Sequence, residues 1–423
     1  MFMGDNILNG MELDSMTAVA PAAIALMPRL VPEAGDVIAN TLAFLRNHLN
    51  MDIAFLSEIK GDQMELVAVD APGFEHLAAV GDILDLDDVY CLHILEGRLP
   101  ELIPDTEAIE FCSQIPITSR IPVRAHVSVP IWRTDKSVYG MFCAVGRQPR
   151  KSLNARDLEV VKAFAALAGD EVNARLDRDK QSGDKKDAIL NVLETGSFEI
   201  ALQPIQRLND QVVAGYEALC RFSPLPYRPP NIWFQDASDV GLQIPLELKV
   251  IRQAVALLDE ISDDQYLSIN TSAATLGSGE IADLIPRVHG HRVVIEITEH
   301  AAIENLDVLL MEIDRLRDMK VRIAVDDAGA GYSGLQQIIR LRPDVIKLDM
   351  SLTQDVDKDV ARRSLASAMV QFAADTHANV VAEGIETAAE LETLRSIGVE
   401  MGQGYFLGRP ELSDDVLAKL KSA

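Results

Sequence analysis

The chain has 423 residues, of which 48% are hydrophobic and 25% charged, and its formal net charge at pH 7 is −26. This length favours two domains, and the composition is typical of a globular protein with a sizeable core. Proteins that bind a nucleic-acid polymer usually present a basic face, so no such partner is expected. A small anionic ligand would need metal ions or a few arginines to reverse the local field.

The cysteines and the N-terminal stretch indicate the cellular compartment. Cys91, Cys112, Cys143 and Cys220 show no CxxC spacing, so we expect reduced thiols rather than disulfides or a structural zinc site. Acidic residues precede the apolar N-terminal stretch, where a signal peptide would be positively charged. Apolar runs fall short of the roughly 20 residues of a membrane span. The sequence therefore predicts a cytoplasmic protein without a membrane partner.

Residues 24–176 show a mixed helical and strand-like pattern after a tail over residues 1–23. A helical stretch, VIANTLAFLRNHL, is followed by short strand-like runs such as IAFLSEI, AHVSVPIW and YGMFCAVG. The region ends in a long amphipathic segment in which apolar residues recur every three or four positions. We therefore predict an α+β domain with a helix at each end.

Residues 177–188 are almost all polar, carry both charge signs and contain a Ser-Gly pair, which predicts a linker. The apolar stripe before this segment suits either a second copy in a homodimer or the domain's own sheet. Beyond it, residues 189–423 alternate short β-rich runs with longer helical stretches. About eight such strands in roughly 235 residues predict an α/β TIM-type barrel, with an open doubly wound sheet as the alternative.

Nearly every predicted strand of this second domain acquires a polar residue near its C-terminal end. In a barrel these ends meet on the face that carries the active site. A single carboxylate there could equally cap a helix or begin a turn. Several on one rim would repel one another unless cations neutralise them. The residues in chain order are Glu217, Asn270, Glu296, Asp326 with Asp327, Lys347 with Asp349, Glu383 and Gln403.

The chemical type of these side chains narrows the ligand that they would bind. Carboxylate and amide oxygens suit hard cations such as Mg²⁺ or Mn²⁺. The adjacent Asp326 and Asp327 could serve two ions, an arrangement used in phosphate-ester hydrolysis with the ions about 3.5–4 Å apart. Lys347 and Asp349 lie two residues apart on one predicted strand and so share a side. The lysine could therefore act on a metal-bound water, or it could only pair with Asp349.

Seven motifs follow one another along the second domain. They are YEALCRF (216–222), SINTS (268–272), EITE (296–299), DDAGAGYSGL (326–335), IKLD (346–349), AEGIET (382–387) and GQGYFLGRP (402–410). In order and spacing they resemble EAL-domain cyclic-di-GMP phosphodiesterases, from about residue 190 to the C-terminus. The resemblance implies hydrolysis of cyclic di-GMP to linear pGpG with two Mg²⁺ or Mn²⁺ ions.

The resemblance also implies roles for single residues. Lys347 resembles the lysine that contacts the catalytic water, Asp349 falls at an active-site position, and Glu383 matches either a further ligand or the base. Glu299 matches the residue that anchors the loop after the paired aspartates. The metal ligands implied by position are Glu217, Asn270, Glu296, Asp326 and Asp327.

Positions that match substrate contacts of the family form a second set, in which Arg221 suits a phosphate oxygen. The chain departs from the family pattern at Ala328 and Gly334, within the loop after the aspartates, and at Ser238, where a glutamate is common. The loop changes bear on loop ordering and rate more than on the chemistry. The substrate-contact set is Gln203, Pro204, Leu219, Arg221, Glu386 and Gln403.

The first domain resembles a GAF domain, most clearly through VSVPIWRTDKSVYGMFCAVG and the helix that follows. Such domains bind small molecules or mediate dimers, so the resemblance implies a regulatory domain that takes a small-molecule or protein input, and a homodimer. Cys91 and His93 are not the adjacent Cys-His pair of bilin-binding GAF domains. We therefore do not expect a bilin.

Two alternatives to an active, sensor-regulated phosphodiesterase stay open. In the first, the barrel is a catalytically silent receptor that binds cyclic di-GMP and signals to a protein partner. Such a receptor is expected to have lost metal-binding side chains, whereas this chain keeps all of them, which favours the enzyme. In the second, the barrel hydrolyses another phosphoester, which motif spacing alone does not exclude.

Overall fold

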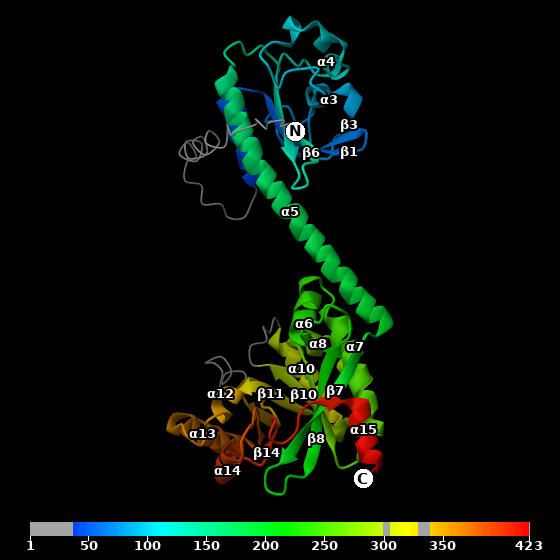
Figure 1. Cartoon of the computed structure of the whole chain (residues 1–423), viewed down its shortest axis with the longest axis vertical. Helices are drawn as coiled ribbons and strands as arrows, with labels where there is room; N and C mark the ends of the chain where they lie inside the picture. The colour runs from blue at the N-terminus through cyan, green and yellow to red at the C-terminus, as the bar shows by residue number, and fades with distance from the viewer. Residues whose placement is uncertain (1–36, 299–304, 329–338, 423) are drawn as a thin grey trace, which may run out of the picture. The chain divides into compact units, whose positions relative to one another are not determined.

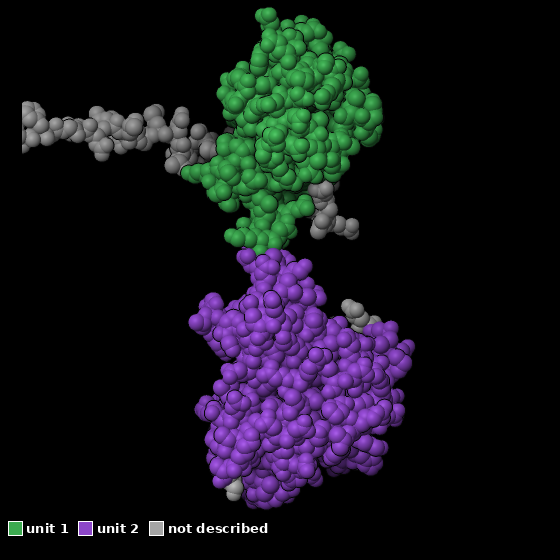
Figure 2. Space-filling view, turned by 90° about the vertical axis from the view of Figure 1, so that its right-hand side faces the viewer, with its two compact units in different colours: residues 1–180 green, residues 181–423 purple. Residues whose placement is uncertain are grey.

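The structure, a computed structural model, describes residues 37–298, 305–328 and 339–422. Contacts between Cα atoms divide the chain into two units, residues 1–180 and residues 181–423, which Figure 2 shows in different colours. The tail over residues 1–23 lies outside the described residues. Within these three described ranges, no helix combines the length and the apolar character needed to cross a bilayer.

Unit 1 is built on a six-stranded antiparallel sheet with helices packed against both faces. The strands are β1 (Ile53–Lys60), β2 (Gln63–Asp70), β3 (Ile83–Asp85), β4 (Leu102–Ile103), β5 (Ala125–Trp132) and β6 (Val138–Gly146), in the sheet order β3-β2-β1-β6-β5-β4. The helices are α2 (Val37–His48), α3 (Tyr90–Leu95), α4 (Ile117–Arg120) and the start of α5 (Ala155–Thr195), and the 3₁₀ turns are η1 (Leu86–Asp88), η2 (Thr106–Ala108) and η3 (Glu110–Gln114).

Strand β6 shows how the sheet separates two apolar cores. Phe142 and Ala144 belong to the core that α2 and α5 cover, whereas Met141 and Cys143 belong to the core that α3 and α4 cover. Successive strand residues point to opposite faces, so a run of apolar residues fills both cores. The predicted α+β domain with a helix at each end is the fold observed.

Helix α5 is continuous over 41 residues and includes residues 177–188, the polar segment predicted to be a linker. Its first part buries Phe164 and Val172 in the core of unit 1, and its last part buries Ile189 and Val192 in the core of unit 2. The residues between them are mostly exposed. A polar, charged segment is compatible with a solvated helix as well as with a flexible linker, so composition alone does not separate the two.

Unit 2 alternates strands and helices along the chain. Its strands are β7 (Phe198–Arg207), β8 (Val213–Phe222), β9 (Tyr266–Thr271), β10 (Val293–Thr298), β11 (Arg322–Ala328), β12 (Val345–Leu348), β13 (Asn379–Ala382), β14 (Met401–Gly402) and β15 (Glu411–Leu412). Its helices are α6 (Pro230–Asp239), α7 (Gln243–Ala256), α8 (Ala273–Gly277), α9 (Ile281–Leu284), α10 (Leu306–Asp318), α12 (Met350–Thr353), α13 (Val360–Thr376), α14 (Ala388–Ser396) and α15 (Ser413–Ser422), with 3₁₀ turns η4 (Leu257–Asp259) and η5 (Arg287–Arg292).

The strands from β7 to β14 form a closed barrel, because β14 pairs with β7 as well as with β13 (Figure 1). Neighbouring strands from β8 to β14 are parallel, as the alternating pattern predicts. Strand β7 is antiparallel to both of its barrel neighbours. A short turn through Gln211, which has a φ of 56°, joins β7 to β8, and strands joined by so short a turn must be antiparallel.

The large core of unit 2 lies between the barrel and its helices. Apolar residues of the strands, such as Ile295 and Ile323, pack there against helix residues such as Ile251 and Leu316. The predicted TIM-type α/β barrel is therefore the fold observed, with β7 reversed. Closure of this barrel is what brings the ends of successive strands to one face.

The continuity of α5 can be tested at Gly183, where an added Cβ would meet nothing within 4 Å. Gly183→Ala should stabilise the surrounding helix by about 0.5–1 kcal/mol, because alanine loses less backbone entropy than glycine. We expect amide hydrogen exchange around residue 183 to slow by about two- to five-fold. Gly61→Ala is the contrasting control, since Gly61 has a φ of +66° and its substitution should not stabilise the chain. Unchanged exchange in Gly183→Ala would contradict a helix at this point.

Candidate functional site

Polar side chains converge on the face of the barrel where its parallel strands end. They come from successive strands of the barrel, and the barrel register sets them side by side. Glu296, for example, is paired with Asn270 across β10 and β9. The contributing residues are Glu217 on β8, Ser268 and Asn270 on β9, Glu296 on β10, Asp326 on β11, Lys347 on β12, Glu383 after β13 and Gln403 after β14.

Lys347 lies at the centre of this group, with 1% of its surface exposed. Its Nζ lies 2.7 Å from Oε2 of Glu296 and 2.7 Å from Oε1 of Glu383. The same atom is 3.3 Å from Oδ1 of Asp326 and 3.7 Å from Oε1 of Glu217. One ammonium thus contacts four carboxylates from four different strands or strand ends, and we call these five residues the acidic rim.

Two neutral amides orient the carboxylates of the acidic rim. Nδ2 of Asn270 donates to Oε1 of Glu217 at 2.7 Å. Nε2 of Gln403 donates to Oε2 of Glu217 at 2.7 Å and to Oε1 of Glu383 at 3.0 Å. These donors hold both carboxylates without adding a second positive charge.

Burial and mutual repulsion shift the protonation equilibria of the acidic rim. Burial raises the pKa of Glu296 to about 8 and that of Glu383 to about 8, although Lys347 acts in the opposite direction. Burial would by itself lower the pKa of Lys347, but the charges of the surrounding carboxylates hold that pKa well above its ordinary value. The lysine therefore stays protonated, and carboxylate charge remains in excess around it.

The acidic rim fits a hard divalent cation. Oδ1 of Asp326 is buried and accepts no hydrogen bond, although it is within ion-pair distance of Lys347. Oε1 of Gln403 is likewise buried without a hydrogen-bond partner. Unsatisfied buried oxygens are costly, and oxygen donors without thiolate or imidazole are the preferred ligands of Mg²⁺ and Mn²⁺.

Four of the predicted substrate-contact residues lie on the strands next to the acidic rim, and two of these bond to main-chain carbonyls. Nε2 of Gln203, which is paired with Glu217 across β7 and β8, donates to the carbonyl of Gly408 at 3.2 Å. The guanidinium of Arg221 donates to the carbonyl of Cys220 at 2.9 Å. The others are Pro204 on β7, Leu219 on β8, the exposed Glu386 after β13, and Gln403 within the amide contacts above.

Asp349 is placed differently from the sequence expectation. Strand β12 ends at Leu348, and Asp349 is the N-cap of α12, where its side chain accepts a hydrogen bond from the backbone N–H of Ser351 at 2.9 Å. The ion pairs found for Lys347 among the described residues are those of the acidic rim and do not include Asp349. Aspartate after a strand is a good capping residue, which is the ordinary role weighed against catalysis.

Three of the residues singled out in the sequence lie wholly or partly outside the described part of the structure. Asp327 follows Asp326 in β11, but its side chain is outside the description. Glu299 and Gly334 lie outside the described residues altogether. Ala328, the other departure from the family pattern, is the buried last residue of β11.

Sequence reasoning missed two hydroxyls beside the acidic rim. Ser268 donates to Oε1 of Glu296, and it lies two residues before Asn270 on the same strand. That period-two spacing puts both side chains on one face and was the available signal. Thr353, fully buried at the end of α12, donates to the carbonyl oxygen of Glu383, a contact between distant segments for which the sequence carries no local signal.

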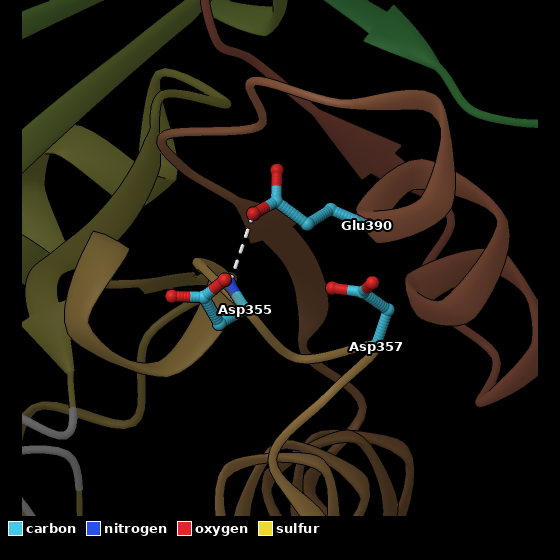
Figure 3. A group of neighbouring side chains, drawn as sticks. All are labelled: Asp355, Asp357 and Glu390. Atoms are coloured by element: carbon cyan, nitrogen blue, oxygen red, sulfur yellow. Dashed lines mark hydrogen bonds between the residues drawn. The ribbon is translucent and has the colours of Figure 1, made fainter.

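A second group of carboxylates, Asp355, Asp357 and Glu390, lies between the α12–α13 connection and α14 (Figure 3). Their oxygens come within 4.8 Å of one another. Glu390 is nevertheless saturated by three backbone N–H groups, and it forms a capping box with Thr387 at the start of α14. Asp355 pairs with Lys358 at 2.7 Å. These contacts explain two of the three carboxylates without a cation.

Unit 1 contains a cavity of about 60 Å³ on the α3 and α4 side of its sheet. Apolar side chains and His126 line it, and Nδ1 of His126 is buried without a hydrogen-bond partner. Burial lowers the pKa of His126 to about 4, so the imidazole is neutral at physiological pH. Cys91, which also lines the cavity, lies with its Sγ 3.8 Å from that of Cys143, and both thiols are free.

Comparison with known proteins identifies both units. A family model of the EAL domain matches residues 186–410, more than half of the chain, and a GAF-domain model matches residues 33–172. The cyclic di-GMP phosphodiesterase NbdA of Pseudomonas aeruginosa is 29% identical over 237 residues, 53% of this chain and 30% of that protein. The oxygen sensor protein DosP of Escherichia coli is 29% identical over 241 residues, 54% of this chain and 30% of its own length. The chain thus spans about a third of these relatives.

A shorter relative and two solved structures agree with this result. The uncharacterised protein Rv1357c of Mycobacterium tuberculosis is 30% identical over 234 residues, 51% of this chain and 76% of that protein. A PaMucR phosphodiesterase structure in complex with c-di-GMP matches with a TM-score of 0.50 and 26% identity, over 55% of this chain and 99% of that one. An EAL-domain protein from Listeria monocytogenes has the same fold, with a TM-score of 0.50 and 23% identity over 55% of this chain and 96% of that one.

These matches cover the barrel that carries the acidic rim and the unit that precedes it, and they confirm the resemblance and the fold class inferred from the motifs. The chain belongs to the EAL-domain family and carries a GAF domain ahead of its EAL barrel.

Proposed function

We propose that this chain is a metal-dependent phosphodiesterase that hydrolyses cyclic di-GMP to linear pGpG. The observation that carries the proposal is the acidic rim, in which four carboxylates and a buried lysine meet at the ends of the barrel strands. Relatives of this chain bear the name of that activity, and one solved neighbour holds c-di-GMP. The acidic rim supplies the oxygen ligands that such a reaction needs.

In this proposal two Mg²⁺ or Mn²⁺ ions are held by Glu217, Asn270, Glu296, Asp326 and Asp327. When bound, the ions would polarise the phosphoryl oxygens and lower the pKa of water. The substrate positions would be Gln203, Pro204, Leu219, Arg221, Glu386 and Gln403. Arg221 on β8 provides a guanidinium for a phosphate oxygen once it leaves the carbonyl of Cys220. Glu299 would anchor the loop after β11, and Asp349 would act at the edge of the site.

In this proposal Lys347 and Glu383 have different roles towards the attacking water: Lys347 orients it, and Glu383 accepts its proton. Lys347 remains an ammonium because carboxylates surround it, so its Nζ donates hydrogen bonds and orients the water rather than taking its proton. Glu383 would accept a proton from the water once bound cations favour its ionised form, since burial alone raises its pKa to about 8 and nearby positive charge acts in the opposite direction. The water oxygen bonds to phosphorus while the bond from phosphorus to the ribose 3′ oxygen breaks, and the proton that the water gives to Glu383 passes to that 3′ oxygen.

Two alternative functions compete with this proposal: a catalytically silent receptor for cyclic di-GMP, and an enzyme that hydrolyses another phosphoester. Purified chain with Mg²⁺ or Mn²⁺ should release pGpG from cyclic di-GMP, and removal of the metal with EDTA should stop the release. Binding of cyclic di-GMP without turnover would overturn the enzyme proposal in favour of the receptor. Faster hydrolysis of simple phosphate monoesters than of cyclic di-GMP would instead identify a different substrate.

We further propose that unit 1 regulates the barrel of a cytoplasmic homodimer through a small molecule or a protein. The cavity beside His126 supports a small uncharged ligand, since its lining contains apolar side chains and a neutral imidazole. Filling it by Ala78→Leu should change the rate of cyclic di-GMP hydrolysis at least two-fold, and an unchanged rate would argue against this route.

Light scattering should give twice the chain mass of 46.3 kDa, whereas a monomer would exclude the dimer.

Glu217→Ala should abolish metal-dependent turnover while the fold is retained. The substitution removes a carboxylate that contacts Asn270, Gln403 and Lys347, and it removes no part of the apolar core. We expect the rate of pGpG release to fall by at least about 100-fold, with circular dichroism unchanged. Glu280→Ala, an exposed carboxylate elsewhere on the barrel, is the control and should keep full activity. Activity of Glu217→Ala near the wild-type rate would mean that the acidic rim is not catalytic.

Metal-free protein should lose stability as the pH rises from about 4.5 towards 8. Glu296 and Glu383 have raised folded-state pKa values of about 8, so the native state binds more protons than the unfolded state in this range. We expect the thermal midpoint in EDTA to fall by at least about 2–4 °C, and Mn²⁺ to stabilise the protein more at pH 8 than at pH 5.5.

The matched control for this pH dependence is Glu383→Gln, which removes one of the two titrating carboxyls and should flatten the profile. A profile of Glu383→Gln in EDTA that runs parallel to that of the wild type would contradict the raised pKa of Glu383.

A further inference from the structure

We propose that Glu390 is a positioning residue, which holds the segment that carries Glu383 in place by binding it to the segment after α12. The inference rests on the proposed phosphodiesterase function and adds a residue that no motif singled out. It concerns Glu390 within the second group of carboxylates, shown in Figure 3, and assigns this residue a structural task in catalysis rather than the binding of a metal.

Glu390 joins two segments that are distant in the sequence. Its side chain is 4% exposed. Oε2 accepts hydrogen bonds from the backbone N–H groups of Glu386 at 3.0 Å and Thr387 at 2.9 Å, so it holds the turn between β13 and α14. Oε1 accepts from the backbone N–H of Asp355 at 2.9 Å, in the connection between α12 and α13, as Figure 3 shows.

A second contact joins the same two segments. The hydroxyl of Thr353, two residues before Asp355, donates to the carbonyl oxygen of Glu383. Gly384 follows with a φ of +64°, and a Cβ there would lie 2.7 Å from Cβ of Met350, the first residue of α12. The segments therefore meet so closely that the main chain of Glu383 is confined on the side of α12.

This confinement determines where the carboxylate of Glu383 lies. With its carbonyl bound to Thr353 and the next turn bound to Glu390, its Oε1 is 2.7 Å from Nζ of Lys347 and 3.0 Å from Nε2 of Gln403. A shift of about 1 Å in such a group costs roughly 100-fold in rate when the group acts on the reacting water. Glu390 thus acts on the reaction through Glu383 without touching the acidic rim.

The charge of Glu390 suits this task. Burial would raise the pKa of Glu390, but the three backbone N–H groups that it accepts from hold that pKa below its ordinary value. The carboxylate is therefore ionised at neutral pH, and charge-assisted hydrogen bonds of this kind are stronger than neutral ones. Both oxygens already have partners, so a cation would have to displace these bonds.

The test compares Glu390→Gln with Glu392→Gln, a neighbour on the same helix that is exposed and pairs with Arg395. An amide has the shape of the carboxylate but only one accepting oxygen, so Glu390→Gln must release one of the two segments. We expect kcat for cyclic di-GMP to fall by about 10- to 100-fold with KM within about three-fold, whereas Glu392→Gln keeps the wild-type values.

Thr353→Val removes the other contact while keeping the shape of the side chain, and it carries the test if Glu390→Gln does not fold. We expect it to lower kcat in the same way. Because both variants weaken the link between the same two segments, their combined effect should be smaller than the product of the single effects.

Titration with Mn²⁺ alone provides a readout that does not depend on turnover. If Glu390 positions Glu383, Glu390→Gln should bind as many Mn²⁺ ions as the wild type, but several-fold more weakly. Loss of one whole ion from the stoichiometry would overturn the inference, because it would make the three carboxylates a metal site. So would wild-type kcat and Mn²⁺ affinity in both Glu390→Gln and Thr353→Val. A wild-type chain without hydrolysis would refute the proposed function, and the Mn²⁺ affinities would still decide the role of Glu390.

Discussion

The structure of the candidate site depends on one buried ammonium that four carboxylates share. Without Lys347, the carboxylates of Glu217, Glu296 and Glu383 would be buried next to one another with only amide and hydroxyl donors to offset their repulsion. With it, they are held within a few ångströms and remain in excess over the single positive charge. The closed barrel makes this possible, because only closure brings side chains from β8 to β14 to the same face.

The same charge balance explains why the hydrogen-bond donors to Glu217 are neutral amides. Asn270 and Gln403 donate to Glu217 from strands or strand ends on opposite sides of it, so they fix its two oxygens without neutralising it. A lysine or arginine at either position would have satisfied the carboxylate and competed with a divalent cation. Neutral donors therefore keep the rim acidic while giving it a defined geometry.

The sequence predicted the positions that depend on strand periodicity and missed those that depend on contacts between loops. Asn270, Glu296 and Lys347 could be placed together because each lies near the C-terminal end of a recognisable strand, and Glu217 because it lies within the neighbouring strand β8. Asp349 also follows a strand, but it caps α12. A carboxylate after a strand can either cap the next helix or belong to an active site, and the sequence alone does not distinguish these roles. Residues 177–188 lie within α5. Their charge and polarity are typical of a solvated helix as well as of a linker, so composition alone did not predict the helix. The reversal of β7 follows from a turn too short for a crossover.

Glu383 and Glu390 show why a carboxylate's partners, and not its place in a motif, decide its role. They lie seven residues apart and both are largely withdrawn from solvent. Glu390 faces three backbone N–H groups, which lower its pKa and commit its oxygens to the fold. Glu383 faces a lysine and an amide within a ring of like charges, and burial raises its pKa to about 8. One segment thus contains a carboxylate whose oxygens are bonded to the main chain and a carboxyl group that can exchange a proton close to neutral pH, and the first determines where the second is held.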